Sequence, residues 1–174
     1  MDRSVAIRAL RSVTRVPSSA YVIEYDGRFT FPVPAAELWA AMAEFDCFSS
    51  WWTWLREFSV EGNGLQHGTV LHGVVAPPLP YRMRLDVVLD ECVPERSITA
   101  LVRGDLQGAA QLTFDGGNTE TRAHAVWTIE MMQRPMRVAA RLAKPLLRWG
   151  HDRVVDATVD GFRGHLVGED ACSL

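Results

Sequence analysis

Residues 121–129, TRAHAVWTI, stand just before the longest helical pattern in the chain. Apolar and polar side chains alternate along this stretch, as they do in a β-strand with one buried face. From Pro135 onward, apolar residues recur every three or four positions instead, which is the spacing of an amphipathic helix. They are Val138, Ala139, Leu142, Leu146, Trp149, Val154, Val155, Val159, Phe162 and Leu166. A helix of about 30 residues is roughly 45 Å long, so this order predicts a sheet crossed by one C-terminal helix.

The preceding part of the chain reads as strands and turns. Residues 21–31 alternate in the same way, with Gly27 predicting a bulge or a bend, and Pro32 ends that strand. A helix is expected over residues 35–44, and hairpin signals such as Asn63-Gly64 then separate some six antiparallel strands. The predicted fold class is α+β. It comprises a curved antiparallel sheet of about six or seven strands wrapped around the long helix, with one or two short helices after the first strand.

The composition is that of an ordinary globular domain, with 48% apolar and 22% charged residues among 174. A formal net charge of -3 argues against nucleic acid as a main partner. The three cysteines show no CxxC spacing, which favours reduced thiols. Neither a membrane-spanning apolar run nor the apolar core of a signal peptide is present, so a cytoplasmic location is expected.

The expected organisation has three parts. Residues 1–20 form a basic arm, because four arginines face one aspartate there. Residues 21–167 form the folded domain, and residues 168–174 form a tail. A homodimer is one option, supported either by the arm or by residues 96–103 if they form an exposed edge strand.

Tryptophan is concentrated in one segment, FDCFSSWWTWL, at residues 45–55. Trp51 and Trp54 fall on one face of a short helix and Trp52 on another, so the three rings cannot all be buried in one place. The segment therefore either plugs one end of the core or contributes one or two rings to the mouth of a pocket.

The order of elements resembles that of the START-like helix-grip superfamily, in its polyketide cyclase/dehydrase and lipid-transport branch (SRPBCC). The resemblance lies in FTFPVPAAELW at residues 29–39, WWTW at residues 51–54 and PLLRWGHD at residues 145–152. It covers about residues 21–167 and rests on element order and apolar pattern. It implies a deep apolar cavity between the sheet and the C-terminal helix that holds a lipid, sterol, polyketide or other hydrophobic ligand.

No motif for a cofactor or a metal is found. The five histidines lack metal-ligand spacing, and phosphate-loop and dinucleotide patterns are absent. His151-Asp152 is the one tempting acid–base pair, but adjacent residues on a helix point about 100° apart. The expectation is therefore a role at the helix surface or kink, with His151 reaching into the cavity as the alternative.

A stripe of positive charge marks the first part of the helix. Arg134, Arg137, Arg141, Lys144 and Arg148 recur at helical spacing with no acid among them. The stripe reads as a solvated face opposite Val138, Leu142, Leu146 and Trp149. The alternatives are transient contact with an anionic membrane or with an acidic protein surface. Pro145 should kink the helix within this region.

The candidate ligand-binding residues follow from the inward parity of strands and helix. The expected walls are Met83, Leu85, Val87, Ala125, Trp127, Leu142 and Leu146, and the expected rim is Trp52, Trp54, Tyr81 and Trp149. The same residues could also simply fill a core.

Two functions are consistent with these patterns. The first is binding or carriage of a hydrophobic small molecule, such as a fatty acyl, isoprenoid or polyketide-like compound, without catalysis. The second is a polyketide cyclase, aromatase or dehydrase that uses the same cavity, and it requires Tyr81, His151 or Arg103 to converge there. The lack of a legible acid–base constellation favours the first.

Overall fold

The computed structural model describes residues 22–168, apart from the side chains of residues 135, 136, 139 and 140. The expected basic arm and residues 169–174 of the expected tail lie outside this range. The elements in chain order are β1 (Val22–Phe31), α2 (Ala35–Met42), the 3-10 turn η1 (Phe45–Cys47), α3 (Phe48–Trp51), β2 (Leu55–Glu61), β3 (Val70–Val75), β4 (Met83–Val93), β5 (Ser97–Gly104), β6 (Leu106–Gly116), β7 (Thr121–Met131) and α4 (Arg134–Leu166).

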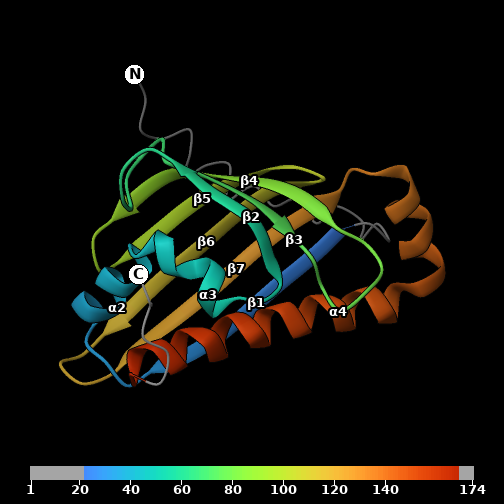
Figure 1. Ribbon diagram of the computed structural model, residues 1–174. Helices are drawn as coiled ribbons and strands as arrows, with labels where there is room; N and C mark the ends of the chain where they lie inside the picture. Colours follow the sequence, from blue (N-terminus) through green and yellow to red (C-terminus); the bar gives the residue numbers. More distant parts are fainter. Residues whose placement is uncertain (1–21, 169–174) are drawn as a thin grey trace.

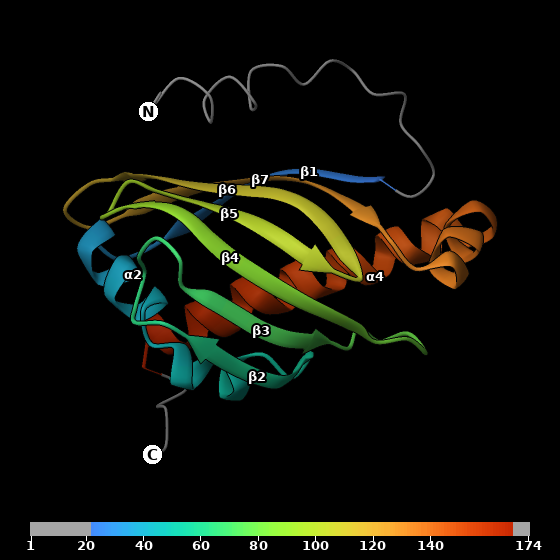
Figure 2. The ribbon, with the colours of Figure 1, turned by 90° about the horizontal axis from the view of Figure 1, so that it is seen from above.

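The seven strands form one antiparallel sheet in the order β1-β7-β6-β5-β4-β3-β2. The sheet curves over α4, and the short helices α2 and α3 lie at one end (Figures 1 and 2). The predicted α+β class and its helix-grip arrangement are confirmed. Residues 96–103, however, belong to β5 in the middle of the sheet, so the expectation of an exposed edge strand there is wrong.

Strand β7 shows how the sequence pattern produces one buried face. Ala123, Ala125 and Ile129 are buried, whereas Thr128, which lies between Ala125 and Ile129, is exposed. The pairing of β1 with β7 runs without a shift from Val22 to Phe31, so Gly27 does not form the predicted bulge. Instead, the ring of Tyr25 occupies the space that a Cβ atom at Gly27 would need.

Helix α4 consists of two segments. Ala143 has non-helical backbone angles (φ -134°, ψ 36°), two residues before Pro145. Proline lacks an amide hydrogen and clashes with the carbonyl of residue i−4, so a break at this point is expected. The first segment turns away from the line of the longer second segment (Figure 1). No helix within residues 22–168 is long and apolar enough to cross a membrane.

The aromatic segment fills one end of the core and also reaches the interior space. Trp51 is buried and packs edge-on against Phe162, while Trp52 and Trp54 stack with ring centroids 5.5 Å apart. Cys47 is disulfide-bonded, so the expectation that the cysteines are reduced is wrong for this residue. Cys92 carries a free thiol.

Candidate functional site

An internal cavity of about 420 Å³ lies between the sheet and α4. Its roof comes from β1, β4, β6 and β7, and its floor from the second segment of α4. The lining residues are Ile23, Phe29, Phe31, Leu38, Met42, Trp52, Trp54, Val75, Pro77, Tyr81, Met83, Leu85, Leu106, Leu112, Phe114, Ala123, Ala125, Trp127, Ile129, Met131, Leu147, Gly150, His151, Val154, Val155, Thr158, Val159 and Phe162. Nearly all of them present carbon atoms, so the site suits an apolar molecule.

Small residues on both layers create the space. Ala123 and Ala125 face inward from β7, where larger residues would reach the helix. On α4, a Cβ atom at Gly150 would lie 2.5 Å from a Leu79 methyl, and one at Gly161 would lie 2.7 Å from the Trp51 carbonyl oxygen. The two glycines therefore let neighbouring segments close the ends of the cavity against the helix.

The structure brings seven of the eleven candidate residues to the cavity wall: Trp52, Trp54, Tyr81, Met83, Leu85, Ala125 and Trp127. These residues come from the aromatic segment, the loop before β4, β4 itself and β7. Strand parity therefore selected the correct face of the sheet.

Three of the remaining four candidates come from α4 and were assigned to the wrong face. Leu142 is 84% exposed, Leu146 is 49% exposed and Trp149 is 44% exposed, and none lines the cavity. Leu147, 7% exposed, takes the inward position. The break at Ala143 interrupts the helical period between the two segments. A row of residues that starts at Val138 and is extended by helical spacing therefore reaches the exposed face of the second segment. Steps of four backward from Val155 lead correctly to His151 and Leu147.

Val87 is the fourth candidate that does not line the cavity. It belongs to β4, but it packs instead against a small separate cluster that contains Leu89, Ile98 and Ala100. Strand β4 is 11 residues long, so part of it extends past the cavity.

His151 supplies the main polar group of the wall. Its side chain is 13% exposed and lies between the cavity and a smaller adjoining pocket of about 150 Å³. The indole nitrogen of Trp127 donates a hydrogen bond to His151 Nε2 (3.2 Å), and Asp152 Oδ1 lies 3.0 Å from Nδ1. The expectation that adjacency prevents a His151–Asp152 pair is therefore wrong, because the aspartate side chain reaches the near ring nitrogen.

Two tyrosines accompany His151. The ring of Tyr25 stacks on Trp127 with centroids 4.1 Å apart, and burial, followed by the charge of Asp152, raises the pKa of Tyr25. Tyr81 lines the cavity, and burial raises the pKa of its phenol. Its hydroxyl lies 3.7 Å from the position of a Cβ atom built on Gly150, so it is close to His151 along the helix. Arg103 is exposed and does not join this group.

Within residues 22–168, no three histidine, cysteine, aspartate or glutamate side chains are grouped so that they could hold a metal ion. The polar side-chain groups among the cavity-lining residues are one phenol, three indoles, one threonine and one histidine. Such groups can orient a ligand by hydrogen bonds and, through His151, accept a proton.

Searches by sequence find no matching protein-family model and no matching curated protein. Solved structures, in contrast, match over most of the chain. The structure of TTHA0849 from Thermus thermophilus has a TM-score of 0.71 at 14% identity, covering 86% of this chain and 100% of that one. The Zhui aromatase/cyclase from a Streptomyces strain has a TM-score of 0.68 at 12% identity, covering 84% and 94%.

A START superfamily protein from Mycobacterium smegmatis also matches, with a TM-score of 0.64 at 8% identity, covering 83% of this chain and 97% of that one. These identities are low, so the similarity concerns the fold. It agrees with the sheet order and the long C-terminal helix described above. The chain therefore has a helix-grip fold, which it shares with these solved structures.

Proposed function

We propose that the protein binds or carries a hydrophobic small molecule between the sheet and α4. The observation that carries this proposal is the cavity of about 420 Å³ with its almost wholly apolar wall. Ligand pockets commonly measure about 300–1,000 Å³. A bound apolar molecule would bury its own surface against this wall, which is favourable by about 25 cal/mol per Å² of apolar surface.

The residue types in the cavity wall restrict the kind of ligand that can bind. The wall has no buried lysine or arginine to neutralise an anion inside the cavity, and its few polar groups gather near His151 and Tyr81. Fatty acyl, isoprenoid and polyketide-like molecules fit such a wall, because they combine a large apolar body with few polar groups. The helix-grip neighbours that bind or convert small molecules support this proposal by analogy of fold.

Native mass spectrometry of the purified protein tests the proposal directly, followed by denaturing extraction of any retained compound. Two variants on the same strand give a matched pair. Ala125→Phe places a large ring in the cavity, whereas Val126→Phe places the same ring on the opposite face of β7. We expect the first variant to lose the ligand and the second to keep it. An apo mass for the wild type, together with no thermal shift across a panel of apolar compounds, would reject the proposal.

The catalytic alternative, a cyclase, aromatase or dehydrase, is favoured by one observation. Tyr81 and His151 both line the cavity, and His151 has a carboxylate behind it. In this case the cavity wall would hold a poly-β-carbonyl chain in a folded conformation, and Tyr81 and His151 would transfer protons to and from it. Incubation with a synthetic poly-β-carbonyl ester and analysis of the products tests it. A product distribution identical to that in buffer alone would reject it.

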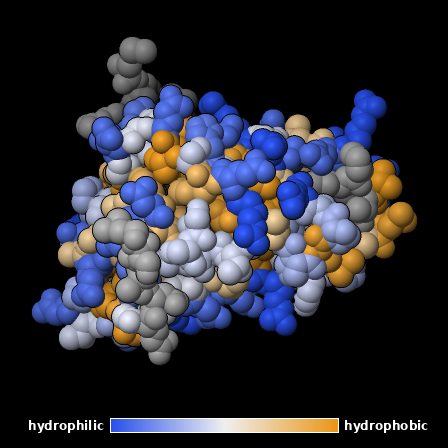
Figure 3. All heavy atoms as spheres, viewed as in Figure 1, coloured by the Kyte–Doolittle hydropathy of each residue, from blue (hydrophilic) through white to orange (hydrophobic). Residues whose placement is uncertain are grey.

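We also propose transient contact with an anionic membrane through the first part of α4. Val138, Leu142, Leu146 and Trp149 are between 44% and 84% exposed, and hydrophobic side chains gather at this end of the molecule (Figure 3). The sequence contains no acidic residue from 131 to 151. Arg134, Lys144 and Arg148 are exposed around the apolar residues. Basic side chains beside exposed apolar ones are what an anionic lipid surface attracts.

Sedimentation with vesicles tests the membrane proposal. The protein should bind vesicles that contain phosphatidylserine and should bind neutral phosphatidylcholine vesicles more weakly. Lys144→Glu with Arg148→Glu should reduce binding at least tenfold, while Arg82→Glu with Arg96→Glu, at exposed positions around β4 and β5, should not. Equal binding by all proteins would reject the contact. Sedimentation velocity in the same buffer would show whether the apolar surface instead forms a homodimer.

A further inference from the structure

At one point in the wall of the cavity, a hydrogen-bond donor and a hydrogen-bond acceptor face each other. The donor is the indole N–H of Trp127 on β7, and the acceptor is Nε2 of His151 on α4, 3.2 Å away. Both residues line the cavity. They come from its two layers, so the pair lies where the sheet and the helix meet around a ligand.

The partners of His151 determine which of its nitrogens carries the proton. An indole nitrogen can only donate, so Nε2 must accept from Trp127. In the neutral ring the hydrogen is then on Nδ1, which donates to Asp152 Oδ1 at 3.0 Å. Asp152 thereby holds His151 in the tautomer that keeps the lone pair of Nε2 directed toward Trp127.

Neighbouring residues hold both rings in place. Tyr25 stacks on Trp127 with an angle of 17° between the rings, and Gly27 leaves room for the Tyr25 ring to lie along β1. His151 packs against both aromatic rings, with centroids 5.3 Å from Tyr25 and 5.5 Å from Trp127. The donor and the acceptor are therefore already directed toward each other before any ligand binds, and only their separation must change.

We propose that Trp127 and His151 together bind a hydroxyl group of the ligand. This inference rests on the proposed function. The hydroxyl oxygen accepts from the Trp127 N–H, and the hydroxyl hydrogen is donated to His151 Nε2. The two nitrogens separate by roughly 1–1.5 Å to admit an oxygen at about 2.8 Å from each. One direct hydrogen bond is exchanged for two, and no buried polar group loses its partner.

This pair discriminates among polar groups. An ether or ketone oxygen accepts from Trp127 but leaves the Nε2 lone pair without a donor. A carboxylate cannot donate either, and its charge would lie in an apolar cavity. Of these groups, the hydroxyl is the one that satisfies both partners, because it is donor and acceptor at one atom. The ligand class is therefore an apolar alcohol or phenol.

The test compares 2-naphthol with 2-methylnaphthalene, which has nearly the same shape but no hydroxyl. The quantity measured is the ratio of their dissociation constants, methyl compound over hydroxyl compound. We expect this ratio to be about tenfold or more higher in the wild type than in Trp127→Phe, which keeps an aromatic ring, or in His151→Leu. If His151→Leu does not fold, His151→Phe replaces it, and Trp127→Phe tests the other half of the pair.

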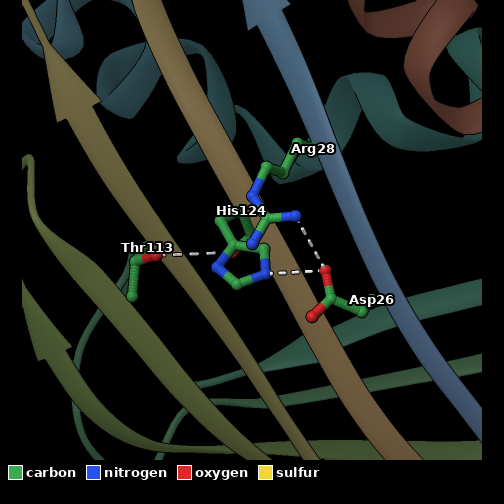
Figure 4. A network of polar contacts seen from close by, with 4 residues as sticks. All are labelled: Asp26, Arg28, Thr113 and His124. Atoms are coloured by element: carbon green, nitrogen blue, oxygen red, sulfur yellow. Dashed lines mark hydrogen bonds and ion pairs between the residues drawn. The ribbon is translucent and has the colours of Figure 1, made fainter.

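The matched control removes a different histidine, which lies on the same strand as Trp127. His124 lies on β7, but its side chain extends toward β1 and pairs with Asp26 at 2.9 Å on the outer side of the sheet (Figure 4). It does not line the cavity. His124→Leu should leave the ratio unchanged within about twofold. The substitution affects only His124 and its partner Asp26, and neither residue lines the cavity.

A spectroscopic readout separates contact from indirect effects. Photoexcited 2-naphthol is a much stronger acid than in its ground state, and it transfers its proton to a hydrogen-bonded base or to bulk water, so the emission is read with all of the compound bound. Bound to the wild type, it should emit as naphtholate, because His151 Nε2 accepts the proton, and this emission should vanish in His151→Leu.

Three outcomes are decisive. An unchanged ratio in Trp127→Phe and His151→Leu, with both compounds bound, overturns the hydroxyl site and leaves the cavity function intact. Binding of neither compound to the wild type overturns the cavity function for aromatic ligands and the site with it. A raised ratio and naphtholate emission that both depend on His151 support the assignment.

Discussion

The two segments of α4 both carry an apolar face but have opposite surroundings. The second segment places Leu147, Val155, Val159 and Phe162 against the sheet, and all four are at most 9% exposed. The first segment extends beyond the ends of the strands (Figure 2), and its Val138 and Leu142 are more than half exposed. The helical period is present in both. Periodicity thus indicates that a helix has an apolar face, but not that another element covers it.

The largest expected difference between the segments is in stability. Phe162→Ala should lower the free energy of unfolding by about 3–5 kcal/mol, because it removes a buried ring that packs against Trp51 and Phe31. Leu142→Ala should change it by less than about 0.5 kcal/mol, because the side chain is 84% exposed. Urea denaturation measures both. Similar losses would mean that a surface covers the first segment in solution.

A smaller effect is expected from the two glycines of the second segment. An alanine Cβ at residue 161 would meet the Trp51 carbonyl at 2.7 Å, whereas at residue 150 it would meet a movable Leu79 methyl. Alanine improves helix propensity by about 1 kcal/mol at either position. Gly161→Ala should therefore be less stable than Gly150→Ala by roughly 1–2 kcal/mol. Equal thermal midpoints of the two variants would show that the Trp51 segment moves freely away from the helix.

The smallest expected effect on stability comes from the contact between His72 and Asp86, which lies on the sheet and outside α4. A hydrogen bond to Asp86 raises the pKa of His72. Its folded pKa therefore exceeds the unfolded value of about 6.5, and its stabilisation is full below that pH and is lost as the pH rises through the folded pKa. Because the pair is exposed, the contribution should stay below about 1 kcal/mol. His72→Gln should cost more at pH 5.5 than at pH 8.5; the reverse order would refute the assignment.

Much of the architecture could be predicted because turns and strands leave local signals. The alternation in residues 121–129 identified the inward face of β7, and hairpin residues separated the later strands. The face of α4 could not be predicted in the same way. Pro145 predicts a kink, but the sequence does not give the rotation between the two segments that the kink produces. Val87 could not be placed either. Strand parity predicts which side of the sheet a residue faces, but it does not predict how far along the strand the cavity extends.

The sequence also could not reveal the polar part of the site. Trp127 and His151 are 24 residues apart, and nothing local indicates that an indole and an imidazole meet. The Asp152 contact needed a side-chain conformation rather than a helical spacing. Long-range pairing between layers is therefore what the structure adds.

The order of strands also has a consequence for how the protein is made. Val22 at the start of β1 pairs with Glu130 of β7, more than 100 residues later. During synthesis, the apolar residues of β1 stay uncovered until β7 has been made, whereas the hairpins from β2 to β6 can already form. The floor of the cavity comes later still, when residues 147–162 leave the ribosome. Under the proposed function, the ligand loads only after that stage, and a cell lacking it holds a complete but less stable protein that chaperones and proteases recognise more often.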